Sequence, residues 1–139
     1  MTEFALDPRL AGDTFAVGEL ALCTLRLMND AAYPWLILVP RQPDCVEIYD
    51  LSEADQTRLH QETRLCALAL QAECRPDKLN IAALGNQVSQ LHLHVIARYR
   101  SDAAWPAPVW GRHPPTAYPD QGSELMARLR QRLGSALSC

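Results

Sequence analysis

The chain has 139 residues, a net charge of −3 and a pI near 5.7, and 48% of its residues are hydrophobic. This length predicts one domain, spanning residues 1–139, with a sizeable core. The acidic balance argues against a nucleic-acid partner, although a small phosphorylated ligand needs only local positive charge. The longest apolar run, residues 35–40, is far below the ~20 residues of a membrane span, and no signal-peptide pattern is present. We therefore expect a cytoplasmic protein with no membrane partner.

The five cysteines of the chain are odd in number, irregularly spaced and contain no Cys-x-x-Cys pair. Such cysteines are typical of reduced, buried thiols in an intracellular protein. The cysteine pattern gives no support for a structural zinc site.

Short strands are predicted in the N-terminal part of the chain. Residues 15–17 and 20–28 are two strand candidates, and Asn29 begins the turn that follows the second one. Residues 35–39 form a continuous apolar run, which is typical of a strand buried on both faces.

One long helix is predicted in the middle of the chain. Ser52 is suited to cap its N-terminus, because the acidic Asp55 follows three positions later, and the helical pattern continues to about Glu73. Its apolar stripe is broad, which indicates contact with both the sheet and a second subunit.

Two strands, an irregular segment and a final helix are predicted after the long helix. Residues 79–84 and 91–99 are the strands, joined by a loop that contains Gly85. Five of the ten prolines lie in residues 106–119, which predicts irregular structure, and residues 123–133 show helical spacing. Since the short spacings leave no room for crossover helices, we predict an α+β fold with an antiparallel sheet, one long helix and a C-terminal helix.

Two of the four histidines lie one residue apart within residues 87–96, where polar and apolar residues alternate from Gln90 to Val95. A strand there would place Gln90, His92 and His94 on one face and apolar residues on the other. A rigid strand is a suitable support for two titratable nitrogens at one site. Gly85, just before this run, permits the close backbone approach that a phosphate requires.

The run from Gln90 to Ile96 resembles the signature of the histidine triad superfamily, in which three histidines alternate with apolar residues. Here the second and third histidines and the apolar positions match, and glutamine stands at the first. Residues 25–30, 35–41 and 105–111 also resemble family segments. The resemblance extends over roughly residues 15–112, the core of the domain, with a loop and helix at 113–139. Trp35 stands where family members often have a further histidine.

The resemblance implies a homodimeric nucleotide hydrolase or transferase with an HIT-like fold. His92 would be the nucleophile, with its second ring nitrogen bonded to a backbone carbonyl, and would form a covalent nucleotidyl-histidine. His94 would assist the departing group, and a protonated imidazole would stabilise the developing charge. Gln90 cannot take up a proton, so a first position that must transfer one would weaken the activity.

The resemblance also implies which residues contact the substrate. Asn29 matches the ribose-binding position, and Gly85, Asn86 and Gln87 match the positions of the phosphate contacts. Trp105, together with Trp110, lies in the C-terminal loop, where a tryptophan of relatives reaches the partner subunit's site. Independently of the resemblance, Arg98 and Arg100 continue the strand face of the histidines and would add positive potential for a phosphate tail.

We therefore predict a small-molecule nucleotide substrate attacked at its α-phosphorus: a dinucleoside polyphosphate, a nucleoside phosphoramidate or an acyl adenylate. No cofactor is required, although Mg²⁺ could accompany a polyphosphate. An alternative is a nucleotide-binding protein with little or no turnover. A second alternative is a metal site at His92 and His94. It would need a third ligand, and the spacing of the other possible ligands in the sequence points to none of them.

Overall fold

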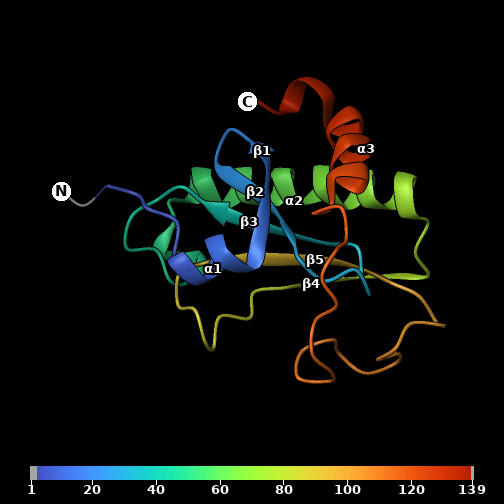
Figure 1. The fold of residues 1–139 in the computed structure, drawn as a ribbon. Coiled ribbons are helices and arrows are strands. Elements are labelled where there is room, and N and C mark those ends of the chain that lie inside the picture. The colour runs from blue at the N-terminus through green and yellow to red at the C-terminus, as the bar shows by residue number, and fades with distance from the viewer. Residues whose placement is uncertain (1–2, 139) are drawn as a thin grey trace.

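The computed structural model describes residues 3–138 and shows an α+β fold with one antiparallel sheet (Figure 1). The five strands lie in the order β1-β2-β3-β5-β4, and every neighbouring pair is antiparallel. The strands are β1 (Thr14–Glu19), β2 (Cys23–Met28), β3 (Trp35–Pro40), β4 (Lys78–Ala82) and β5 (Leu93–Arg98). The helices are α1 (Pro8–Asp13), α2 (Glu53–Cys74) and α3 (Ser123–Leu133), with short 3-10 turns at Ile48–Asp50 and Gly134–Ala136. The predicted fold class is confirmed.

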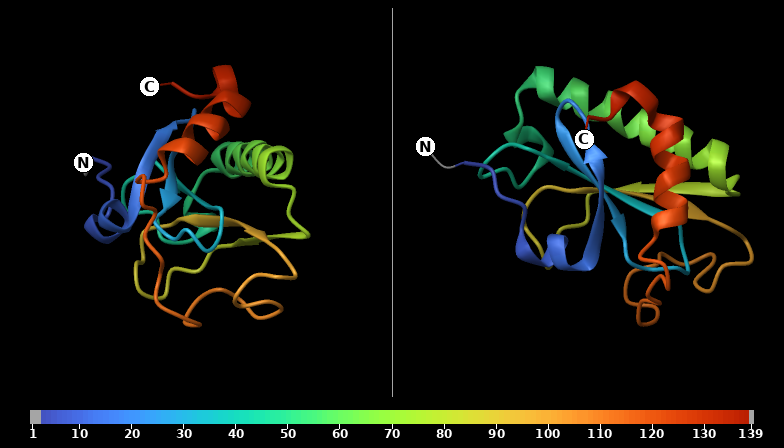
Figure 2. Two further views of the ribbon diagram at one scale, coloured as in Figure 1. Left: turned by 45° about the vertical axis from the view of Figure 1, so that its right-hand side comes forward. Right: turned by 45° about the horizontal axis from the view of Figure 1, so that its top comes forward.

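The sheet is covered on both faces. Helices α2 and α3 lie on one face, and the long loops lie on the other (Figure 2). The alternation of β3 divides its side chains between the two cores: Leu36 and Leu38 belong to the helix-side cluster, whereas Trp35 and Ile37 belong to the loop-side cluster. All six residues of β3 and of β5 are buried. The two central strands are therefore a rigid base for the loop-side residues.

Helix α2 begins where the sequence predicts, because the Ser52 hydroxyl accepts the backbone N–H of Asp55 at 3.1 Å. Its last residue is Cys74, and the next residue, Arg75, has a positive φ of 48° that stops the helix before Pro76. Its buried Glu62 carboxylate accepts the N–H groups of Leu22 and Cys23 at 2.8 and 2.9 Å, and so ties the helix to the β1–β2 turn. Among residues 3–138, no helix combines the length and the apolar character needed to cross a bilayer.

The structure changes the expected bounds of the last two strands. The strand expected over residues 79–84 ends at Ala82, and the one expected over 91–99 begins only at Leu93. The reason is that Leu91 donates its N–H to the carbonyl of Cys45, outside the sheet, at 2.9 Å. His92 therefore lies just before β5, at the end of a loop.

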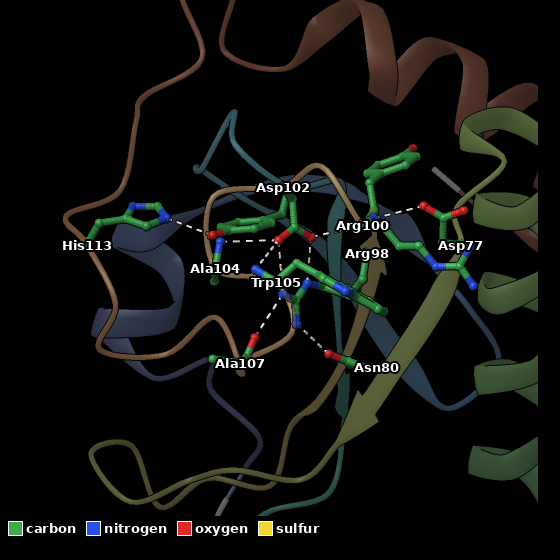
Figure 3. Close-up of polar contacts among 11 residues, drawn as sticks. Asp77, Asn80, Arg98, Arg100, Asp102, Ala104, Trp105, Ala107 and His113 are labelled. Carbon is green, nitrogen blue, oxygen red and sulfur yellow. Dashed lines mark hydrogen bonds and ion pairs between the residues drawn. The ribbon is translucent and has the colours of Figure 1, made fainter.

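A buried ion pair shapes the chain after β5 (Figure 3). The Arg98 guanidinium contacts the Asp102 carboxylate at 2.8 and 3.1 Å, with both side chains at most 3% exposed. Arg98 also donates to the Asn80 side chain and to the carbonyl of Ala107, each at 2.8 Å. Burial alone would raise the pKa of Asp102, but hydrogen bonds from Arg98 and from backbone amides outweigh it and lower the pKa to about 2. The pair thereby folds residues 99–107 back onto the sheet.

We expect Arg98→Met to lower the free energy of unfolding by about 3–5 kcal/mol, because it leaves the Asp102 carboxylate buried without its cation. Removing both charges while keeping an acceptor for the backbone amides, in Arg98→Met with Asp102→Asn, should cost less than the single change. Urea denaturation of the three proteins measures the difference. A single-variant loss below ~1 kcal/mol would show that water replaces the guanidinium.

Candidate active site

His92 and His94 lie side by side on the loop-covered face of the sheet, with ring centroids 4.9 Å apart. Both residues are buried, at 5% and 3% exposure. His94 is held in β5 between Ile37 of β3 and Ala82 of β4. The predicted alternation is confirmed here, because Leu91, Leu93 and Val95 pack in the helix-side core.

The His92 ring has a defined tautomer when it is neutral. Its Nδ1 lies 2.6 Å from the carbonyl oxygen of Gln90, and a carbonyl can only accept, so Nδ1 carries the proton. The lone pair is then on Nε2. The residue lines two cavities, of about 410 and 130 Å³, at this edge of the loop-covered face. A neutral His92 thus has the tautomer of an imidazole nucleophile.

His94 has the opposite tautomer. The indole N–H of Trp35 donates to His94 Nδ1 at 3.0 Å, so the proton is on Nε2, which lies 3.3 Å from the Leu84 carbonyl. Burial, and then the proximity of His92, lower the pKa of His94 to about 4. The expectation of a protonated His94 is therefore wrong at neutral pH: this side chain is a neutral hydrogen-bond donor.

The Gln90 amide is engaged with the N-terminal segment. Its oxygen accepts the backbone N–H of Asp7 at 2.9 Å, and its nitrogen donates to the carbonyl of Ala5 at 2.8 Å. The prediction that this side chain acts in catalysis is therefore corrected, because both of its polar atoms already have backbone partners. Gln90 contributes to the site through its carbonyl, which orients His92.

The loop before β5 requires glycine at position 85. A Cβ on Gly85 would come within 2.7 Å of the Val88 carbonyl oxygen, closer than real Cβ contacts. Asn86 and Gln87 line the larger cavity together with both histidines. The structure therefore brings these three predicted residues next to His92, and their contact with phosphate stays a prediction.

A further cavity, of about 360 Å³, adjoins the histidine cavity and shares four of its lining residues: Asp13, Met28, Trp110 and Gly111. Asn29 lines this second cavity, where a nucleoside is predicted to bind. The Asn29 side-chain oxygen accepts the N–H of Tyr118 at 2.9 Å. A hydrogen bond from Asn29 to a ribose would therefore come from its amide nitrogen.

Trp110, and not Trp105, is the loop tryptophan beside the histidines of its own chain. The Trp110 ring lies 5.1 Å from the His94 ring and 6.0 Å from the Trp35 ring, edge-on to both. Trp105 instead lies over the Arg98 guanidinium, 5.7 Å from its carbon, and lines neither cavity (Figure 3). Its predicted substrate contact is corrected for this chain, as is the phosphate contact of Arg98, whose guanidinium is buried.

Two residues of the N-terminal helix α1 contribute to the site, and the sequence patterns did not predict either of them. Asp13 lines both larger cavities, and Arg9 reaches the Gln87 side chain with its Nη2 at 3.2 Å. The Asp7 cap followed by Pro8 is the usual signal for such a helix. Its position beside the histidines depends on contacts between residues 80 or more positions apart.

A metal centre at the two histidines lacks a third ligand. Across the described residues 3–138, no three His, Cys, Asp or Glu side chains come together in a way that could hold a metal ion. The metal hypothesis therefore gains no support from the arrangement.

Comparisons with known proteins identify the family. The family model described as "HIT domain" matches residues 10–101. A histidine triad protein from Bradyrhizobium japonicum has a TM-score of 0.93 and 46% identity, covering 96% of this chain and 100% of that one. One from Marinobacter aquaeolei has a TM-score of 0.92 and 47% identity, covering 95% and 97%. No curated protein matches significantly. The chain belongs to the HIT domain family of histidine triad proteins.

Proposed function

We propose that this chain is a nucleotide hydrolase or transferase that uses His92 Nε2 to attack the α-phosphorus of a nucleoside phosphate derivative. Proteins of the HIT family are typically enzymes of this kind. The observation that carries the proposal is the 2.6 Å hydrogen bond from His92 Nδ1 to the Gln90 carbonyl. It fixes the lone pair on the nitrogen that would attack.

The reaction would proceed in two displacements. As the bond from Nε2 to phosphorus forms, the bond from phosphorus to the leaving group breaks, and the leaving group keeps the electron pair. Water then attacks the same phosphorus, the nitrogen–phosphorus bond returns its pair to His92, and a nucleoside monophosphate is released. Because His92 becomes cationic in the intermediate, the hydrogen bond to the Gln90 carbonyl grows stronger at that step.

His94 would assist by hydrogen bonding, without giving up a proton. Its Nε2–H can turn from the Leu84 carbonyl, 3.3 Å away, to an oxygen of the reacting phosphate. With a pKa of about 4, the ring is neutral at pH 7 and is not a general acid there. A leaving group that needs a proton would then take it from water.

The rest of the substrate would extend over the two adjoining cavities. Asn29 would bind the ribose, and Gly85, Asn86 and Gln87 would contact phosphate oxygens. The protein groups supply the whole reaction, so no cofactor is required, and Mg²⁺ would enter only with a polyphosphate substrate. For the three substrate classes, the leaving group would be a nucleoside polyphosphate, an amine and a carboxylate, respectively.

A second function, nucleotide binding with little turnover, is favoured because neither Gln90 nor His94 is a general acid at neutral pH. The first has its amide bound to backbone groups, and the second accepts the Trp35 indole N–H. This function predicts that wild-type protein binds AMP but neither turns over substrate nor acquires a covalent nucleotidyl group.

We further propose a homodimer. Within residues 3–138, strand β4 pairs only with β5, so its outer edge is open in the described part of the single chain. Beside it, Ile81 of β4 and Leu68 of α2 are exposed by 50% and 49%, and Leu65 by 39%. An open strand edge next to exposed apolar side chains suits a second copy of the same surface.

His92→Ala should lower the turnover of an adenosine phosphoramidate or a dinucleoside polyphosphate by roughly 10³-fold or more, because it removes the nucleophile. Gln131→Ala, which changes an exposed side chain on α3, is the control and should keep wild-type rates. Steady-state assays with both substrates, and intact-mass detection of the nucleotidylated protein, make the measurement. Retention of a tenth of the wild-type rate by His92→Ala would contradict the nucleophile assignment.

The double variant Leu68→Glu with Ile81→Glu should convert a dimer to monomers, since it places charges on the apolar patch of both copies. Size-exclusion chromatography with light scattering gives the mass of each protein. A wild type that is monomeric at micromolar concentration would contradict the homodimer.

The free energy of unfolding should fall as the pH drops from 7 to 5, and the titration of His94 should cause part of that fall. The unfolded chain takes up a proton near pH 6.5, but the folded ring does so only near pH 4, so acid favours unfolding between these values. At pH 5 the titration of His94 should lower the free energy of unfolding by on the order of 2 kcal/mol relative to pH 7. Urea denaturation at pH 7 and 5 should show a larger loss for wild type than for His94→Asn. Equal losses would mean that the folded His94 titrates normally.

A further inference from the structure

The cavities around His92 carry carboxylates but no cationic side chain. Asp13 and Asp30 line the larger cavities, and Glu47 lines the small one. No lysine or arginine is among the described residues that line these three cavities. If the proposed function holds, the ligand brings at least one negative phosphate into this environment. Positive charge must then reach the phosphate from outside the cavity walls.

Arg9 of α1 is placed to provide that charge. Its Nη2 donates to the Gln87 side-chain oxygen at 3.2 Å, and Gln87 lines the same cavity as His92 and His94. Within residues 3–138, no carboxylate lies within 4.0 Å of the Arg9 guanidinium, in contrast to Arg98 or Arg128. A neutral amide oxygen is a weak partner for a guanidinium, whereas a phosphate is a strong one.

The backbone that carries Arg9 is held in place by Gln90. The two hydrogen bonds of its amide, to Asp7 N and Ala5 O, fix the segment that leads into α1. The Asp7 carboxylate then caps the helix at Arg9 N, at 2.8 Å, and the buried Leu10 anchors it in the loop-side core. The side chain at position 90 thus acts as a clamp on the N-terminal segment.

We propose that Arg9 is a phosphate-binding residue of this site and that Gln90 is the positioning residue that delivers it. The inference builds on the proposed nucleotide function and adds an anion contact from outside the triad segment. Glutamine at the first triad position cannot transfer a proton. Its two hydrogen bonds to the backbone instead hold the segment that places Arg9 beside Gln87, at the cavity of the histidines.

The test is the affinity for AMP and for adenosine, measured by isothermal titration calorimetry at low ionic strength. Arg9→Ala should raise the Kd for AMP roughly tenfold and leave the Kd for adenosine within twofold, because only AMP carries the phosphate. Arg9→Lys should recover part of the affinity. Arg58→Ala, which removes an exposed arginine from α2 on the other side of the sheet, is the matched charge control and should resemble wild type.

Gln90→Ala tests the clamp. It should weaken AMP binding about as much as Arg9→Ala, with no additional loss when both changes are combined, and hydrogen exchange of residues 5–9 should become faster. Additive losses would overturn the positioning role. An AMP affinity unchanged by Arg9→Ala would overturn the phosphate contact while leaving the proposed function intact. A wild type that binds neither AMP nor adenosine would overturn both.

Discussion

The hydrogen bond between His92 Nδ1 and the Gln90 carbonyl is the interaction on which the rest of the site depends. It requires the chain to leave the sheet just before β5, because a carbonyl engaged in the strand ladder would not turn toward the ring two residues later. The Leu91 N–H accordingly pairs with Cys45, outside the sheet, and Gly85 lets the preceding loop close on the Val88 carbonyl. The departure from ideal strand geometry is therefore what orients the proposed nucleophile.

The two histidines are made chemically different by their second partners. A backbone carbonyl leaves His92 with a lone pair on Nε2, whereas the Trp35 indole, a donor only, leaves His94 with a proton there. Trp35 is thus more than an apolar replacement for a histidine: it prevents the neighbouring ring from presenting a second lone pair. Burial in the aromatic contact with Trp110 keeps that ring neutral.

Local periodicity was sufficient to predict the long helix, strand β3, the final helix and the common face of His92 and His94. Those features depend on residues close in sequence, such as the Ser52 cap and the alternation after Gln90. What could not be predicted depends on distant partners. Arg98 has the spacing of a site residue but is buried, and its guanidinium donates to Asn80, 18 positions away. Trp105 and Trp110 differ only in how the proline-rich loop folds.

Position 90 illustrates why a substitution within a motif cannot be interpreted from chemistry alone. Considered by itself, glutamine in place of histidine only removes a group that can take up and release a proton. In the fold, the same amide has one acceptor and one donor that match a backbone N–H and a carbonyl 83 and 85 positions away. The substitution therefore shifts this residue from the reacting groups to the N-terminal segment. The proposed catalysis would then depend on the orientation of His92 and on fixed hydrogen-bond donors, since a relay of protons through three imidazoles is no longer possible.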